Sequence, residues 1–196
     1  MYKSSRKSIL PNILLFLVVI SSAWGVIWSI SAWGISDQRY FTNQSNLIVF
    51  ITVFLVFISQ RDQKWFKYLS AIALVNITMT GLIYHVLLAT PPIAFQSHLT
   101  HTITPILYIL FYFICLEDSI KPKQFWIPLL YPMLYFLFFL VTGPLTGFYP
   151  YGFMNVAEQG LLTVLKFVVL FMLPGIAFMS WILLFIKKEL ETKNKG

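Results

Sequence analysis

Six long stretches of apolar residues fill most of the chain, and short polar segments separate them. The stretches cover residues 9–33, 45–59, 68–89, 99–116, 125–142 and 161–186. Most of them reach the length of about 20 residues that a helix needs to cross the hydrocarbon of a bilayer. The alternation typical of a transmembrane β-barrel is absent from the sequence, so helix is the expected state. The pattern predicts an all-α polytopic membrane protein with six transmembrane helices in a single domain, residues 1–196.

The second stretch is the shortest of the six, and its helix should therefore start earlier than its apolar residues do. We expect this helix to begin near Phe41, which brings the polar segment FTNQSN (residues 41–46) into its first turns. That segment would then lie within the outer part of the bilayer.

The composition agrees with a membrane location. Hydrophobic residues make up 58% of the 196 residues and charged residues only 11%. A soluble domain of this size could not cover so much apolar surface. We therefore expect the protein to lie in the cell membrane as an integral, multi-pass protein.

The basic residues predict how the chain is oriented. If six helices cross the membrane, 12 of the 14 Lys and Arg fall in segments on the same side as the N-terminus. Cytoplasmic segments carry an excess of Lys and Arg, so both termini should be cytoplasmic. The net charge of +7 then reflects topology, and we expect no nucleic-acid partner. The twelve residues are Lys3, Arg6, Lys7, Arg61, Lys64, Lys67, Lys121, Lys123, Lys187, Lys188, Lys193 and Lys195.

Polar side chains collect at the outer ends of the predicted helices. FTNQSN opens the second helix, Tyr84 and His85 close the third, and His98 and His101 open the fourth. With this orientation, all of them fall within one layer a few helical turns thick. Pro105 lacks an N–H group and leaves the carbonyl of His101 without its usual helical partner, so we expect a local distortion there. A layer of this kind favours a functional site.

The residue types in this layer favour a hydroxyl nucleophile over a metal. Three histidines without carboxylates or thiolates make a poor metal site, and we expect neither a metal nor another cofactor. Neutral imidazole accepts a proton near pH 7 and can activate a threonine hydroxyl. Thr42 and His101 are the favoured pair, because both lie near helix N-termini whose free N–H groups can stabilise an oxyanion.

Two structural interpretations remain open beside this one. Thr42 can act as a helix cap, and polar side chains in membranes often form hydrogen bonds between helices. The loop GFYPYGFMN (residues 147–155) is either a lid over the site or part of an aromatic belt at the membrane surface.

Several short motifs, in this order, resemble a known family. They are the FTNQSN helix start, Tyr84-His85, the segment His101-Thr-Ile-Thr-Pro105, the Tyr131-Pro132 pair and the GFYPYGFMN loop. The chain resembles the bacterial six-pass membrane proteins (Pr-six-Pr type) related to the androgen-induced and androgen-dependent membrane proteins of animals. The animal members are threonine hydrolases that cleave fatty acid esters of hydroxy fatty acids within the membrane. The resemblance implies a six-helix fold with cytoplasmic termini, with Thr42 as the nucleophile and His101 as the base.

The first hypothesis is thus an intramembrane lipid-ester hydrolase with a fatty acyl ester as substrate. Thr42 and His101 would be catalytic, and Gln44, Asn46, Tyr84 and His85 would bind the substrate or orient the pair. The alternative is a non-catalytic membrane protein that binds or transports a lipid or a small amphiphile. The distance between the Thr42 hydroxyl and the His101 ring separates them, because only hydrolysis requires hydrogen-bond contact.

Overall fold

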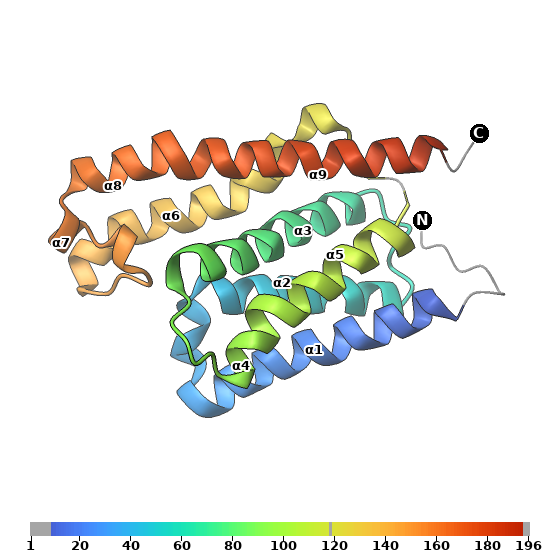
Figure 1. Cartoon of the computed structure of the whole chain (residues 1–196), viewed down its shortest axis with the longest axis horizontal. Helices are drawn as coiled ribbons and strands as arrows, with labels where there is room; N and C mark the ends of the chain where they lie inside the picture. The colour runs from blue at the N-terminus through green and yellow to red at the C-terminus, as the bar shows by residue number, and fades with distance from the viewer. Residues whose placement is uncertain (1–8, 118, 194–196) are drawn as a thin grey trace.

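The computed structural model describes residues 9–117 and 119–193, and these form a bundle of long helices joined by short turns (Figure 1). The described residues contain no β-strand, which confirms the all-α prediction. Of the basic residues counted for topology, Lys3, Arg6, Lys7 and Lys195 lie outside the described residues. The elements in chain order are α1 (Leu10–Trp33), η1 (Ile35–Arg39), α2 (Phe41–Phe57), α3 (Phe66–Ile83), η2 (Tyr84–Leu88), α4 (Phe95–His98), η3 (Leu99–Ile103), α5 (Thr104–Cys115), η4 (Pro122–Gln124), α6 (Trp126–Thr146), η5 (Gly152–Met154), α7 (Val156–Gln159), α8 (Leu161–Phe167), η6 (Val168–Met172) and α9 (Leu173–Lys193).

Five helical stretches are long and apolar enough to cross a membrane. The helix α2 is also apolar but has only 17 residues. It begins at Phe41, as the sequence predicted. The five stretches are Leu10–Trp33, Phe66–Leu88, Phe95–Cys115, Pro122–Thr146 and Leu161–Lys193.

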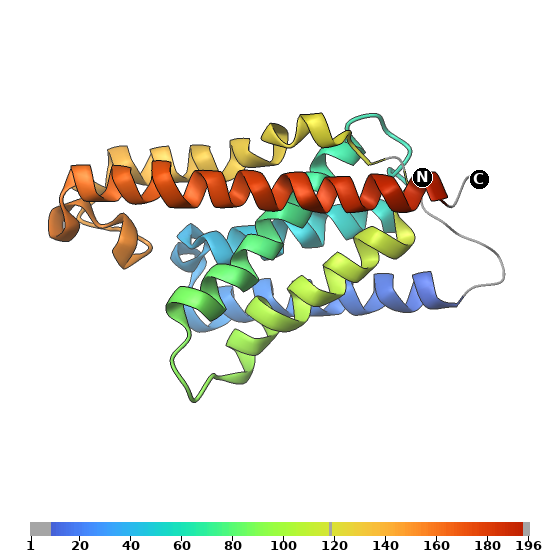
Figure 2. The same cartoon turned by 45° about the horizontal axis from the view of Figure 1, so that its top comes forward.

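The long helices run side by side along the long axis of the molecule (Figures 1 and 2). The start of α1 and the end of α9 lie at one end of the bundle, and α4 and α7 lie toward the other (Figure 1). The largest buried cluster joins α1, α2, α3 and α5 and includes Val18, Val49, Leu74 and Tyr108. A second cluster, with Phe41, Met79 and Ile176, joins α2 and α3 to α9. The helices α2 and α3 contribute to both clusters, and Phe41 at the start of α2 belongs to the second.

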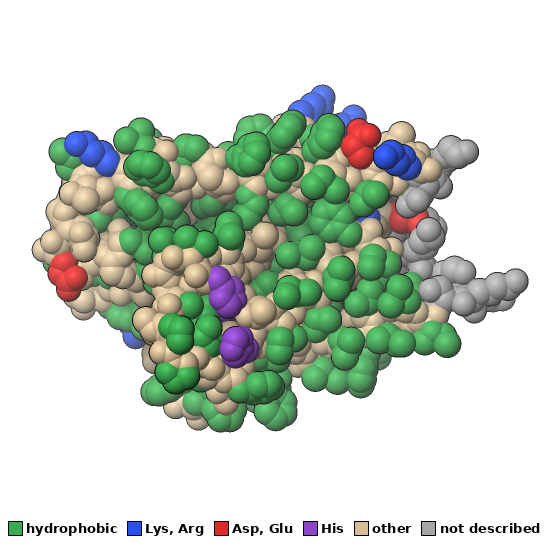
Figure 3. Space-filling view, viewed as in Figure 1, with side chains coloured by type: hydrophobic (Ala, Val, Ile, Leu, Met, Phe, Trp, Pro, Cys, Tyr) green, Lys and Arg blue, Asp and Glu red, His purple; other side chains and the backbone are tan. Residues whose placement is uncertain are grey.

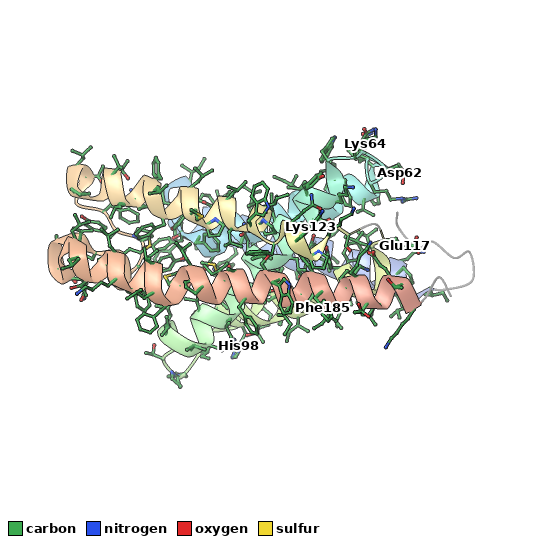
Figure 4. All side chains as sticks on the ribbon, turned by 90° about the horizontal axis from the view of Figure 1, so that it is seen from above. Asp62, Lys64, His98, Glu117, Lys123 and Phe185 are labelled. Atoms are coloured by element: carbon green, nitrogen blue, oxygen red, sulfur yellow. The ribbon has the colours of Figure 1, made fainter. Side chains whose placement is uncertain are left out.

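The outer surface of the bundle is apolar. Figure 3 shows hydrophobic side chains over the visible face and charged side chains toward its ends. Phe57, Leu134 and Phe171 are each about two-thirds exposed, at 71%, 65% and 68%. Large exposed apolar areas are rare on soluble proteins, so lipid is the surrounding that fits this surface. Figure 4 shows charged residues toward the end of the bundle where α9 ends, namely Asp62, Lys64 and Glu117. His98 lies farther along the bundle, past its middle.

A buried lysine attaches α9 to the end of α5. Lys187 is 3% exposed, and its Nζ donates to the carbonyl of Phe113 at 3.1 Å and to that of Leu116. The last carbonyls of a helix have no partner within the helix. A cation near them is also stabilised by the negative end of the helix dipole. Lys187 thus caps the C-terminal end of α5, in addition to being one of the basic residues counted for topology.

Candidate active site

Thr42 and His101 are brought into contact by α2 and η3. Thr42 lies in the first turn of α2, and His101 lies in the middle of η3. The distance from Thr42 Oγ1 to His101 Nε2 is 3.1 Å, which is hydrogen-bond distance. Both side chains are half-buried. A hydroxyl and an imidazole in this arrangement have the geometry of an activated nucleophile and its base.

The other ring nitrogen of His101 determines where its proton lies. Nδ1 is 2.9 Å from the carbonyl oxygen of Ser97 and 3.0 Å from Thr100 Oγ1. The Thr100 hydroxyl donates its own proton to the carbonyl of Gln96 at 3.0 Å, so both groups facing Nδ1 are acceptors. Nδ1 must therefore carry a proton, and in the neutral ring Nε2 keeps the lone pair that faces Thr42.

The backbone around His101 is wound as a single π-helical turn, η3, which ends two residues before Pro105. This confirms the local distortion that Pro105 predicted. Gly81 of α3 lies directly against the turn, since a Cβ atom at this glycine would be 2.9 Å from the His101 carbonyl oxygen. Single π-helical turns are frequent at functional sites, and this one sets the position of His101.

Two of the predicted orienting residues hold the pair in place. The Tyr84 ring stacks on the His101 ring, with centroids 3.8 Å apart and an angle of 20° between the planes. Asn46 is fully buried, and its Nδ2 donates to the carbonyl of Thr42 at 2.8 Å and to that of Thr100 at 3.3 Å. Asn46 thus ties the turn that carries the hydroxyl to the turn that carries the imidazole.

The other two predicted orienting residues lie away from the pair. Gln44 accepts a hydrogen bond from the Tyr131 hydroxyl at 2.7 Å and donates to the carbonyl of Gln38 at 2.9 Å. These bonds join α2 to α6 and η1. His85 is exposed and its Nε2 lies 2.8 Å from Thr102 Oγ1. Neither residue lines the two cavities described below.

Tyr151 is a site residue that the sequence interpretation did not single out. It belongs to the GFYPYGFMN loop, and its hydroxyl oxygen accepts a hydrogen bond of 3.4 Å from the Thr42 N–H. Burial raises the pKa of the Tyr151 phenol, so the group stays protonated at neutral pH and keeps a proton to donate. This contact favours the lid interpretation of the loop over that of a simple aromatic belt.

Thr42 lies where two cavities meet. The first has about 600 Å³ of empty volume, including space open to the surroundings, and is lined mainly by apolar residues such as Met79, Ile83 and Ile176. The second has about 770 Å³ on the same basis and is lined by polar and aromatic residues, including His101. Thr42, Tyr84 and Tyr151 line both cavities, whereas His101 lines only the second.

In the part of the chain that the structure describes, no group of three or more His, Cys, Asp or Glu side chains is placed to hold a metal ion. Comparisons with protein-family models, with curated proteins and with solved structures find no match for this chain.

Proposed function

We propose that the protein is an intramembrane lipid-ester hydrolase in which Thr42 is the nucleophile and His101 the general base. The observation that carries this proposal is the 3.1 Å contact between Thr42 Oγ1 and the His101 nitrogen that bears the lone pair. A binding protein has no need for a hydroxyl held against an unprotonated imidazole nitrogen. The resemblance to the membrane threonine hydrolases assigns the same two residues the same roles.

The first half of the reaction forms an acyl-enzyme. Thr42 Oγ1 attacks the ester carbonyl carbon while His101 Nε2 takes the hydroxyl proton. The resulting oxyanion receives a hydrogen bond from the Tyr151 phenol, which lies beside Thr42. When the tetrahedral intermediate collapses, the bond to the alcohol oxygen breaks and the imidazolium gives its proton to that oxygen. The alcohol leaves, and the acyl group stays on Thr42.

The second half returns the enzyme to its starting state. Water enters the position that the alcohol has left, and His101 takes a proton from it as it attacks the acyl carbon. The imidazolium then returns this proton to Thr42 Oγ1 as the fatty acid is released. Atoms balance as one ester and one water giving one acid and one alcohol.

The two cavities fit the two parts of such a substrate. The group that His101 protonates must lie on the side of His101, so the alcohol occupies the polar cavity. The acyl chain then extends from Thr42 into the first cavity, whose lining is mainly apolar and so suits a hydrocarbon chain. In the animal proteins that the chain resembles, the alcohol part of the ester is a hydroxy fatty acid.

We also infer that α2 crosses the bilayer as a sixth span and that both termini are cytoplasmic. The supporting observations are the apolar sequence of α2 and its place among the long helices. With this orientation the site opens toward the outer face, and Asn46 and the other buried polar groups lie just below it.

The test is ester hydrolysis by the purified protein in detergent or lipid nanodiscs. Wild type should hydrolyse a long-chain fatty acyl ester, and Thr42→Ala and His101→Ala should each lower kcat/KM by about a thousandfold or more. Thr42→Ser keeps a hydroxyl and should retain measurable activity. His98→Ala is the matched control, because His98 is exposed and lines neither cavity. Equal turnover by wild type and Thr42→Ala would refute Thr42 as the nucleophile, and no turnover by wild type would favour a binding role.

A further inference from the structure

The polar cavity carries a negative charge among aromatic rings. Asp37 lines it, and no other Asp or Glu of the described chain does so. Five aromatic side chains line it as well: Trp28, Trp33, Tyr40, Tyr84 and Tyr151. Carboxylates and aromatic faces both attract cations, and aromatic cages are a common way to bind quaternary ammonium groups.

One oxygen of Asp37 is held in place by the protein. Oδ2 accepts hydrogen bonds from the Ser29 hydroxyl at 2.6 Å and from Asn43 Nδ2 at 2.8 Å. Asn43 Nδ2 also donates to the Asp37 carbonyl at 2.8 Å. These bonds fix the carboxylate, while no hydrogen bond from a described residue reaches Oδ1.

No described cation neutralises Asp37. No ion pair to Asp37 is found within residues 9–117 and 119–193. Arg39 is close in sequence, but its guanidinium lies 3.9 Å over the Phe148 ring and does not line the cavity. Among the described residues, His101 is the one basic residue that lines it, and its contacts are those of a neutral ring. The cavity therefore holds an unbalanced negative charge.

We infer that the polar cavity selects esters whose alcohol carries a positively charged ammonium group. This inference rests on the proposed function, because the alcohol is placed in this cavity by the need for His101 to protonate it. The ammonium group lies between the Asp37 carboxylate and the aromatic rings, and the ester carbonyl lies at Thr42. An alcohol with a carboxylate in the same place is repelled by Asp37. The inferred preference therefore differs from that of a hydrolase for hydroxy fatty acid esters, in which the alcohol part carries a carboxylate.

The experiment compares decanoyl esters of alcohols that match in size and differ in charge. The cationic esters carry a trimethylammonium group two or six carbons from the ester oxygen; the neutral ones carry a tert-butyl group there, and the anionic ones a carboxylate. Wild type should hydrolyse the cationic ester with a kcat/KM about tenfold above that of its neutral match at one or both spacings. The reason is that both the aromatic rings and the carboxylate attract the ammonium group. The anionic ester should fall below the neutral one.

Asp37→Asn identifies the charge responsible. The asparagine oxygen can accept the same bonds from Ser29 and Asn43, so the fold should be kept. The ratio of cationic to neutral kcat/KM should fall to about threefold, since only the aromatic contribution remains. Glu158→Gln is the matched control: Glu158 is an exposed carboxylate in α7 that lines neither cavity, and its ratio should equal that of wild type.

Each result has one meaning. A wild type that hydrolyses the cationic and neutral esters equally at both spacings, or a ratio unchanged by Asp37→Asn, overturns the charge selection and leaves Thr42-dependent hydrolysis intact. A wild type that hydrolyses none of the esters overturns both proposals. If Asp37→Asn fails to fold, the comparison of esters by wild type still decides.

Discussion

The position of the proton on the His101 ring depends on two acceptors that face one of its nitrogens. The carbonyl of Ser97 and the Thr100 hydroxyl oxygen hold the proton of His101 on Nδ1. Nε2 is thereby left free to accept from Thr42 at 3.1 Å. In the proposed mechanism the carbonyl of Ser97 takes the orienting role that a carboxylate has in the serine triads. No acid within the bilayer is needed, and burying a charged carboxylate there would be costly.

The Tyr151 hydroxyl is the expected oxyanion donor, and its removal tests this. Tyr151→Phe should lower kcat by about a hundredfold with little change in KM, because the bond strengthens only in the transition state. Tyr149→Phe is the control, since Tyr149 lies in the same loop and packs against Gly143. Equal kcat values for the two variants would remove Tyr151 from the mechanism.

At the scale of helices and turns, small residues permit the close approaches that assemble the site. A Cβ atom at Gly81 would lie 2.9 Å from the His101 carbonyl oxygen, and one at Gly25 would lie 2.9 Å from Thr100 Cγ2. The first contact is with backbone, which cannot rotate away. The π-helical turn is therefore positioned by the surface of α3 as well as by Pro105.

Gly81→Ala should shift η3 and separate His101 from Thr42. Alanine normally stabilises a helix relative to glycine by about 0.5–1 kcal/mol, but here the clash should lower both Tm and ester hydrolysis. Gly175→Ala is the control, because Gly175 lies in α9 and a Cβ atom there would meet no described neighbour within 4 Å. It should keep wild-type activity and a Tm at least as high. A fully active Gly81→Ala protein would show that η3 does not depend on this contact.

The sequence predicts these elements well and their contacts less well. The helices follow from the lengths of the apolar stretches, and the distortion at His101 follows from Pro105. The start of α2 at Phe41 was expected because its apolar stretch alone was too short. Tyr151 was different: it meets Thr42 across 109 residues, and no local pattern fixes such a distance. Lys187 likewise was expected only as a basic residue near the membrane surface, since its cap depends on how α9 packs on α5.

At the scale of the whole molecule, the two ends of the bundle differ in chemistry. One end has a large cavity lined by Arg61, Lys64, Lys67, Lys121 and Lys188 together with two acidic residues. The candidate active site lies nearer the other end, among the residues that open α2 and η3. Excess positive charge is typical of the cytoplasmic side. In the proposed orientation the site faces the outer leaflet, from which it would receive the lipid esters of the proposed reaction.

Labelling of single cysteines tests this orientation. In a Cys115→Ser background, Ser36→Cys and Gln63→Cys place exposed thiols before and after α2, and Gln159→Cys places one in α7. In intact cells, a membrane-impermeant maleimide should label positions 36 and 159 and leave position 63 unlabelled. All three should react after the cells are opened.

The other labelling patterns have distinct meanings. The reverse pattern would invert the topology. Equal labelling of positions 36 and 63 in intact cells would refute the sixth span formed by α2. Equal labelling of positions 63 and 159 would refute the three spans expected between them.

The central claim is that the Thr42 hydroxyl is a nucleophile activated by His101, and covalent labelling tests it most directly. The purified protein is treated with a fluorophosphonate probe, digested and analysed by mass spectrometry to locate the adduct. The adduct is expected on Thr42 itself, with labelling absent in Thr42→Ala, strongly slowed in His101→Ala and unchanged in His98→Ala. No adduct on wild type, or an adduct on another residue that persists in Thr42→Ala, would contradict the claim.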